Sequence, residues 1–168
     1  MRRSSAFVAA LVAIVTLLSA RAGFAVGMSG PTATISSWNL ASTGANSISG
    51  GTLTVSALFS AYTVTVTADK TRMTEYSGSA YVSGGKTLTA PLNVAAVIST
   101  PHCLVPGTGA TAIIGTSTTL ATGVGLALTG CSDAYAITLS QATSISDPAL
   151  PAGHKYHIVL TYTVSGGL

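Results

Sequence analysis

Beyond residue 24 the chain alternates between apolar and hydroxyl-bearing residues in short stretches. In "YTVTVTA" (62–68), tyrosine, valine and alanine occupy every second position and threonines stand between them. The stretches "AYAITLS" (134–140) and "KYHIVLTYTV" (155–164) repeat this period of two. Because successive side chains of a strand point to opposite faces, each stretch predicts a β-strand with one buried face and one wetted face.

Shorter apolar runs predict further strands. They are "TATIS" (32–36), "GTLTVSA" (51–57), "AYVS" (80–83), "KTLTAPLNVAAVI" (86–98), "TAIIGTS" (111–117) and "GVGLALTG" (123–130). Glycines and prolines predict turns between them, at Gly50–Gly51, Gly84–Gly85, Pro106–Gly107, Gly123, Gly130 and Pro151–Gly153. Several short strands separated by turns predict an all-β fold, a sandwich or barrel. We expect 155–164 to be one central strand, because its five alternating apolar residues need a buried face.

Residues 1–25 have the pattern of a secretory signal peptide, so we predict an N-terminal signal helix followed by one domain at 26–168. Two arginines precede an apolar run at 6–18, and small residues follow it. The run is shorter than the about 20 apolar residues that span a membrane, which disfavours the alternative of a retained anchor. We expect cleavage after Ala25, or alternatively after Ala22, and a secreted protein.

Loss of the leader would also remove the excess of positive charge. The whole chain has 7 Lys and Arg against 4 Asp and Glu, and three of the arginines precede residue 25. Nucleic-acid binding needs clustered basic residues, so we expect no nucleic-acid partner. A net charge near zero favours association, so we expect the chain to bind copies of itself or other envelope proteins.

Cys103 and Cys131 are the only cysteines of the chain. In an exported protein, two cysteines most simply form one disulfide, and the alternative is a pair of buried thiols.

The sequence contains no complete enzyme motif, so we expect no catalytic, cofactor-binding or metal site. A small secreted enzyme would have to use Asp133 or Asp147. Asp147 directly precedes a proline, and Asp133 stands just before a predicted strand, so we interpret both as turn or cap residues. His102 and Cys103 are neighbours, and on an extended chain their side chains point to opposite faces. They therefore cannot act as a catalytic base and its nucleophile unless the chain is kinked there.

Two kinds of surface residue suggest binding. Trp38, Tyr76 and Tyr81 are candidates for an interaction surface, such as a glycan platform, because tyrosine and tryptophan are common at interfaces. The alternative is that Trp38 and Tyr81 pack at the edge of the core. The threonine stripes of the predicted strands fit an array that orders water, or simply the wetted face of a sheet.

Three segments, "GTLTVSALFSAYTVTVTADKTRM", "KTLTAPLNV" and "ALPAGHKYHIVLTYTV", resemble the layout of secreted immunoglobulin-like surface proteins of prokaryotes. This group includes WxL-type cell-wall proteins and pilin-like filament subunits. The resemblance implies an immunoglobulin-like antiparallel β-sandwich with Greek-key connections. The chain departs from the group because it has no W-x-L tripeptide, its cysteines lie mid-chain, and Gly167 stands where those pilins have a tyrosine.

The resemblance further implies a structural subunit of a cell-surface layer or pilus-like filament that assembles by strand addition. The expected donor is an arm at residues 26–35, with Val26, Met28, Ala33 and Ile35 as its apolar residues. The expected acceptor is the groove beside the last strand. The alternative function is a secreted adhesin or glycan-binding module of the same fold.

Overall fold

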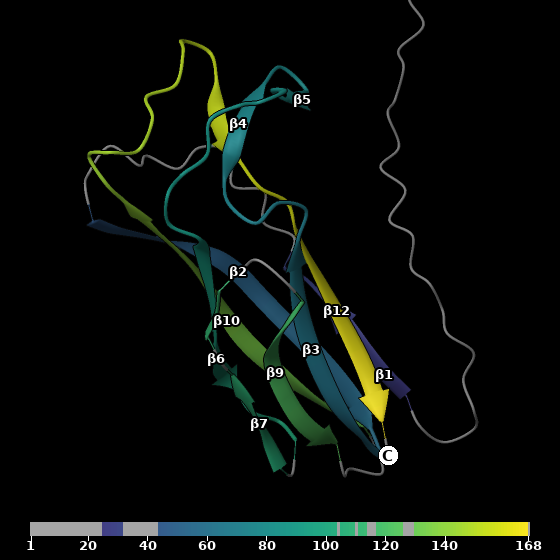
Figure 1. Ribbon diagram of the computed structural model, residues 1–168. Helices are drawn as coiled ribbons and strands as arrows, with labels where there is room; N and C mark the ends of the chain where they lie inside the picture. The colour runs from purple at the N-terminus through teal and green to yellow at the C-terminus, as the bar shows by residue number, and fades with distance from the viewer. Residues whose placement is uncertain are drawn as a thin grey trace, which may run out of the picture.

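Every regular element that the structure describes is a β-strand (Figure 1). The computed structural model describes residues 25–31, 44–103, 105–109, 111–113, 117–125 and 130–167. Within these ranges no helix is long and apolar enough to cross a membrane. The prediction of an all-β fold is confirmed, whereas the predicted signal helix lies outside the described residues.

A five-stranded sheet has the order β1-β2-β10-β6-β8, and all its neighbours are antiparallel. Its strands are β1 (Ala25–Ser29), β2 (Gly44–Leu58), β10 (Cys131–Thr143), β6 (Leu92–Thr100) and β8 (Thr111–Ile113). The long strands β2 and β10 form its centre. The short strand β1 pairs with the last five residues of β2 only, from Thr54 to Leu58.

A four-stranded antiparallel sheet has the order β12-β3-β9-β7. Its strands are β12 (Leu160–Gly167), β3 (Ser60–Ala68), β9 (Thr118–Gly125) and β7 (Val105–Gly109). The two sheets face each other, because buried side chains from both form one hydrophobic core. We call these two sheets the body of the molecule.

The side chains predicted to be buried from the period of two do form the core. Tyr62, Val64 and Val66 of β3 are buried, and they pack in one cluster with Tyr135 and Ile137 of β10. The threonines between them point away from the core. Burial of alternate side chains from two facing sheets is the main favourable contribution to folding of such a body.

A small three-stranded sheet, β11-β4-β5, stands at one end of the body (Figure 1). It consists of β4 (Thr74–Ser77), β5 (Ala80–Tyr81) and β11 (Lys155–His157). We call this sheet, with its loops at 69–73, 82–91 and 144–154, the cap. Its interior contains the buried side chains of Met73 and Leu88.

The prediction of one central strand at 155–164 is wrong. The chain changes sheets at Ile158–Val159, so Lys155–His157 pairs with β4 of the cap and Leu160–Gly167 pairs with β3 of the body. Asp69 fixes this break: its N–H donates to the Val159 carbonyl at 3.1 Å, and its Oδ1 accepts from the Val159 N–H at 2.8 Å. β12 is also an edge strand rather than a central one.

Three of the predicted turns are parts of strands. At Gly50–Gly51 the register between β2 and β10 shifts, so the pair forms a bulge within a continuous strand. Gly123 lies within β9, where a Cβ atom would be 2.3 Å from the Tyr62 hydroxyl oxygen. The glycine is needed there because the Tyr62 ring packs directly against the backbone. The prediction of a turn at Pro106–Gly107 is also wrong, since both residues belong to β7.

Candidate functional site

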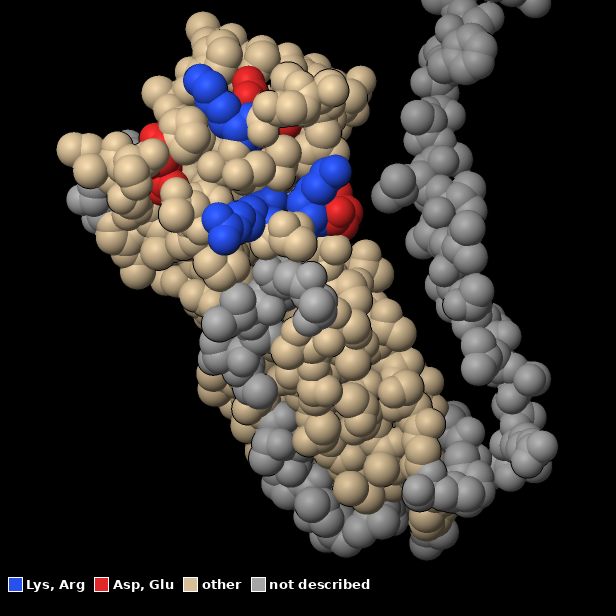
Figure 2. All heavy atoms as spheres, viewed as in Figure 1, with Lys and Arg blue, Asp and Glu red and all other residues tan. Residues whose placement is uncertain are grey.

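The charged residues gather at the cap. Of the eight Asp, Glu, Lys and Arg residues beyond residue 24, seven belong to the cap, and the eighth, Asp133, is fully buried in the body. In Figure 2 the blue and red spheres accordingly lie over one part of the molecule, and the rest of the described surface in this view is uncharged. The molecule therefore has a charged end and a neutral body.

The neutral body has a face of regularly spaced hydroxyls. On the outer side of the four-stranded sheet, Thr161 and Thr163 of β12 stand opposite Thr67 and Thr65 of β3. Two of the predicted threonine stripes, those of β3 and β12, therefore lie side by side on one face. This arrangement gives the body a polar surface without charge.

Glu75 of β4 is bound within the cap. Its Oε2 accepts the Lys86 N–H at 2.9 Å, and its Oε1 lies 2.5 Å from His154 Nδ1. The backbone hydrogen bond from Lys86, followed by that from His154, holds the pKa of the Glu75 carboxyl below its ordinary value. This carboxylate joins three segments of the cap and is nearly buried.

Asp147 connects the loop after β10 to the cap in the same way. Its two oxygens accept the N–H groups of Thr89 and Ser144, at 2.8 and 2.7 Å. The hydrogen bonds from these two backbone groups lower the pKa of the Asp147 carboxyl. The sequence interpretation of Asp147 as a turn residue fits its bond to Ser144, three residues earlier.

The protein is expected to lose stability in acid through these two carboxylates. A carboxyl whose pKa is lower in the fold than in the unfolded chain stabilises the fold above about pH 4, and the contribution is lost as pH falls through the folded pKa. Urea unfolding between pH 7 and pH 2 should therefore show falling stability below about pH 4. Glu75→Gln combined with Asp147→Asn should flatten that decline, and an unchanged acid profile would contradict this role.

Tyr76 and Tyr81 lie together, as the prediction of a common surface requires. Tyr76 of β4 stands directly opposite Tyr81 of β5 and Lys155 of β11. The tyrosine rings meet edge to face with centroids 5.3 Å apart, and the His157 ring lies 4.3 Å from Tyr76 and 5.6 Å from Tyr81. Sequence reasoning missed His157, although its place two residues after Lys155 puts it on the same side of a strand.

Two lysines flank these rings. Lys70 Nζ lies 4.7 Å from the centroid of the Tyr81 ring, and Lys155 Nζ lies 5.6 Å from that of Tyr76. Burial, together with the hydrogen bond that the Tyr81 hydroxyl donates to Asp69 Oδ2 at 2.6 Å, raises the pKa of Tyr81. We call Tyr76, Tyr81, His157, Lys70 and Lys155 the aromatic face of the cap.

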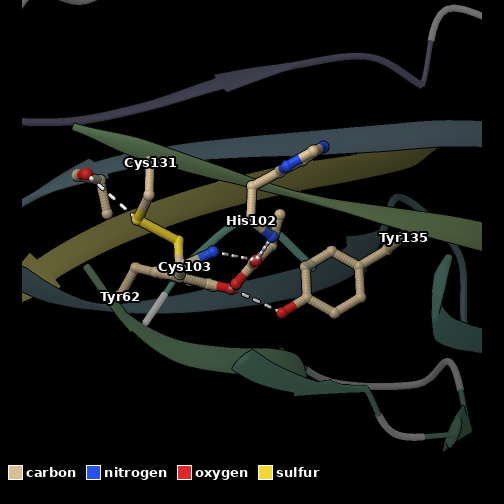
Figure 3. Close-up of a disulfide and its surroundings, with 7 residues drawn as sticks. Tyr62, His102, Cys103, Cys131 and Tyr135 are labelled. Atoms are coloured by element: carbon tan, nitrogen blue, oxygen red, sulfur yellow. Dashed lines mark hydrogen bonds between the residues drawn. A yellow bond between two sulfur atoms is a disulfide. The ribbon is translucent and has the colours of Figure 1, made fainter. Parts of the chain in front are cut away.

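A second polar cluster lies inside the body, beside the disulfide (Figure 3). Tyr62 donates to Asp133 Oδ2 at 2.6 Å, and Tyr135 donates to the Tyr62 oxygen at 2.6 Å. Asp133 Oδ1 also accepts the N–H groups of His102 and Cys103, at 3.0 and 3.2 Å. Burial raises the pKa of both tyrosines.

Asp133 is therefore a buried anchor, and the interpretation of it as a turn or cap residue is wrong. It lies within β10 and is fully buried. The sequence carried one signal of this: Tyr62 and Tyr135 were both predicted to face the core, and buried tyrosine hydroxyls need a partner.

The predicted disulfide between Cys103 and Cys131 is confirmed. It ties the segment after β6 to the start of β10, and Cys103 is buried. The same segment contributes the two N–H groups that bind Asp133, so the disulfide and the polar cluster hold one loop in place.

The predicted arm is partly described. Val26 and Met28 belong to β1, where both pack against the core, and β1 pairs with β2 of its own chain. Ala33, Ile35 and Trp38 lie outside the described residues.

The acidic residues named as enzyme candidates are not brought together. Asp133 stands near the start of β10, and Asp147 follows its end. In the part of the chain that the structure describes, no three His, Cys, Asp or Glu residues are grouped so that they could hold a metal ion. Each of the two carboxylates accepts at least two backbone hydrogen bonds, Asp133 from His102 and Cys103 and Asp147 from Thr89 and Ser144.

Comparisons with known proteins assign the chain to no family. Neither protein-family models, nor curated proteins, nor solved structures match the chain.

Proposed function

We propose that the chain is a secreted, non-enzymatic structural subunit of a cell-surface layer or pilus-like filament, assembling by exchange of its first strand. In this proposal the fold is of the immunoglobulin-like kind that the sequence resemblance implies. The observation that carries the proposal is the position of β1 at the seam between the two sheets of the body.

β1 is only five residues long and lies between β2 and β12 at this seam. On one side it pairs with Thr54–Leu58 of β2. On the other it packs against β12, because a Cβ atom at Gly166 would lie only 2.7 Å from Val26 Cγ2. Figure 1 shows β1 beside β12 at this edge of the body. The predicted donor arm and the predicted acceptor strand are therefore neighbours within one chain.

The same interactions can be made between two chains. If β1 of one copy entered the seam of the next, Val26 and Met28 would re-form the same apolar contacts and the same strand pairing. Exchange of an identical element between protomers is a low-energy route to oligomers. Cleavage after Ala25, as expected from the leader, would leave this strand at the start of the mature chain.

β12 is an edge strand, and beyond its contact with β1 at Gly166 its edge favours a contact between copies. Its sequence, LTYTVSGG, contains no charged residue and no proline, and its pairing with β3 has no bulge. Natural edge strands are usually protected by such features against pairing with other chains. Together with a body surface free of charge, this edge supports a protein that packs against its own copies.

The proposal predicts that the mature chain, residues 26–168, assembles with rising concentration. Size-exclusion chromatography with light scattering and negative-stain electron microscopy should show oligomers or filaments. Val26→Ser combined with Met28→Ser should abolish assembly, because the donor strand then has no apolar residues for the seam. Ser29→Ala, on the outward side of the same strand, is the matched control and should assemble normally. A wild type that stays monomeric at millimolar concentration would contradict the proposal.

A further inference from the structure

The three carboxylates of the cap all serve its own architecture. Glu75 and Asp147 accept backbone and side-chain hydrogen bonds, as described above. Asp69 accepts the Tyr81 hydroxyl and the Val159 N–H, at 2.6 and 2.8 Å. In the described part of the chain the one ion pair is that of Glu75 with His154.

The two lysines of the aromatic face are therefore without an ion pair. Lys70 and Lys155 are exposed, and their ammonium groups lie over the tyrosine rings rather than beside a carboxylate. The rings of Tyr76, Tyr81 and His157 are half-buried, so part of each is accessible to solvent. The face combines exposed aromatic surface with two positive charges held next to it.

We propose that the aromatic face binds a carboxylated sugar, such as a uronic or sialic acid residue of a polysaccharide. The C–H face of a sugar ring packs on an aromatic ring, which offers apolar area at a small cost in side-chain entropy. The carboxylate would accept charge-assisted hydrogen bonds from the lysines, which are stronger than bonds between neutral groups. A neutral sugar would leave the lysines unused, and a simple anion would leave the rings unused.

Other polyanions fit this face less well. Nucleic acids bind through many clustered cations, whereas the described surface of the body has none. An acidic peptide would satisfy the lysines but offers no flat C–H face for the rings. The inference does not rest on assembly, because the whole face belongs to the cap of a single chain.

Titration calorimetry on the mature chain tests this binding. The acidic probes are trigalacturonate, for uronic acids, and 3′-sialyllactose, for sialic acids. The neutral controls are maltotriose and lactose, and triglutamate represents an acidic peptide. We expect one acidic sugar to bind in the millimolar range or tighter, and every control to bind at least about tenfold more weakly, the effect of losing one charge-assisted hydrogen bond. Binding of neither acidic sugar, or equal binding of triglutamate, would overturn the proposal.

Matched lysine variants locate the site. Lys70→Gln combined with Lys155→Gln should weaken binding by about tenfold or more. Lys86→Gln is the control, because the Lys86 ammonium donates to the Ala149 carbonyl at 2.6 Å and is not part of the aromatic face. It should bind within about twofold of wild type, far less than the tenfold change of one such bond. Equal weakening in both variants would show a general effect of charge and overturn the proposal. A two-dimensional NMR spectrum confirms that each variant is folded.

Discussion

Asp133→Ala is expected to destabilise the protein by about 4 kcal/mol, since each buried group left without its partner costs about 1–3 kcal/mol. The variant would leave the Tyr62 hydroxyl and the N–H groups of His102 and Cys103 without their acceptor. Typical domains are stable by only about 5–15 kcal/mol, so much of the fold's stability would be lost. Urea denaturation followed by tyrosine fluorescence measures the change.

Two variants serve as controls for Asp133→Ala. Tyr62→Phe removes one donor to the carboxylate and the acceptor of the Tyr135 hydroxyl, but it leaves the carboxylate its two backbone bonds, so it should cost about 1–2 kcal/mol. Asp147→Ala also removes a carboxylate that accepts two backbone N–H groups, but at a partly exposed site where water can replace it. If Asp133→Ala were no more destabilising than Asp147→Ala, Asp133 would not be the anchor of this region.

Cys103→Ala combined with Cys131→Ala is expected to lower the free energy of unfolding by about 3.5 kcal/mol. The bond closes a segment with a sequence separation of 28, and a cross-link of this span restricts the unfolded chain. Alanine is the appropriate replacement because Cys103 is buried and a serine hydroxyl would need a partner. The measurement is urea denaturation of the variant and of the oxidised wild type.

Reduction supplies an independent check of the same bond. Wild type unfolded in reductant should lose as much stability, relative to oxidised wild type, as the double variant does. The mass of the oxidised protein should be two hydrogen atoms below that of the reduced form. If the variant matched oxidised wild type in stability, the disulfide would contribute nothing to the fold.

The alternation of residue types was enough to predict the core of the body. It identified the buried faces of β3 and β10 and the all-β class, because a period of two depends only on local strand geometry. It could not predict the partners of a strand. The period of two runs unbroken through 155–164, yet Asp69 holds Val159 at the point where the chain passes from β11, paired with β4, to β12, paired with β3.

The aromatic face and the buried cluster show a second limit of prediction from local sequence patterns. Tyr76 and Tyr81 are close in sequence, so their pairing could be predicted, but Lys155 and His157 reach them only through the pairing of β11 with β4. Asp133 resembles a turn residue because Cys131 and Ser132 precede it and a predicted strand follows it. Its burial follows from long-range contacts with Tyr62 and His102, which no local pattern contains.

Exchange of β1 between chains is tested most directly by a cross-link across its pairing with β2. Ser29 stands opposite Thr54, and both face outward, so Ser29→Cys with Thr54→Cys places two thiols within disulfide reach. Thr52→Cys with Ala136→Cys is the control, because it joins β2 to β10 within the body and must stay within one chain. After oxidation of assembled protein, a denaturing non-reducing gel should show a ladder of covalent multimers for the first pair and monomers for the control. Monomers alone from the first pair would contradict strand exchange.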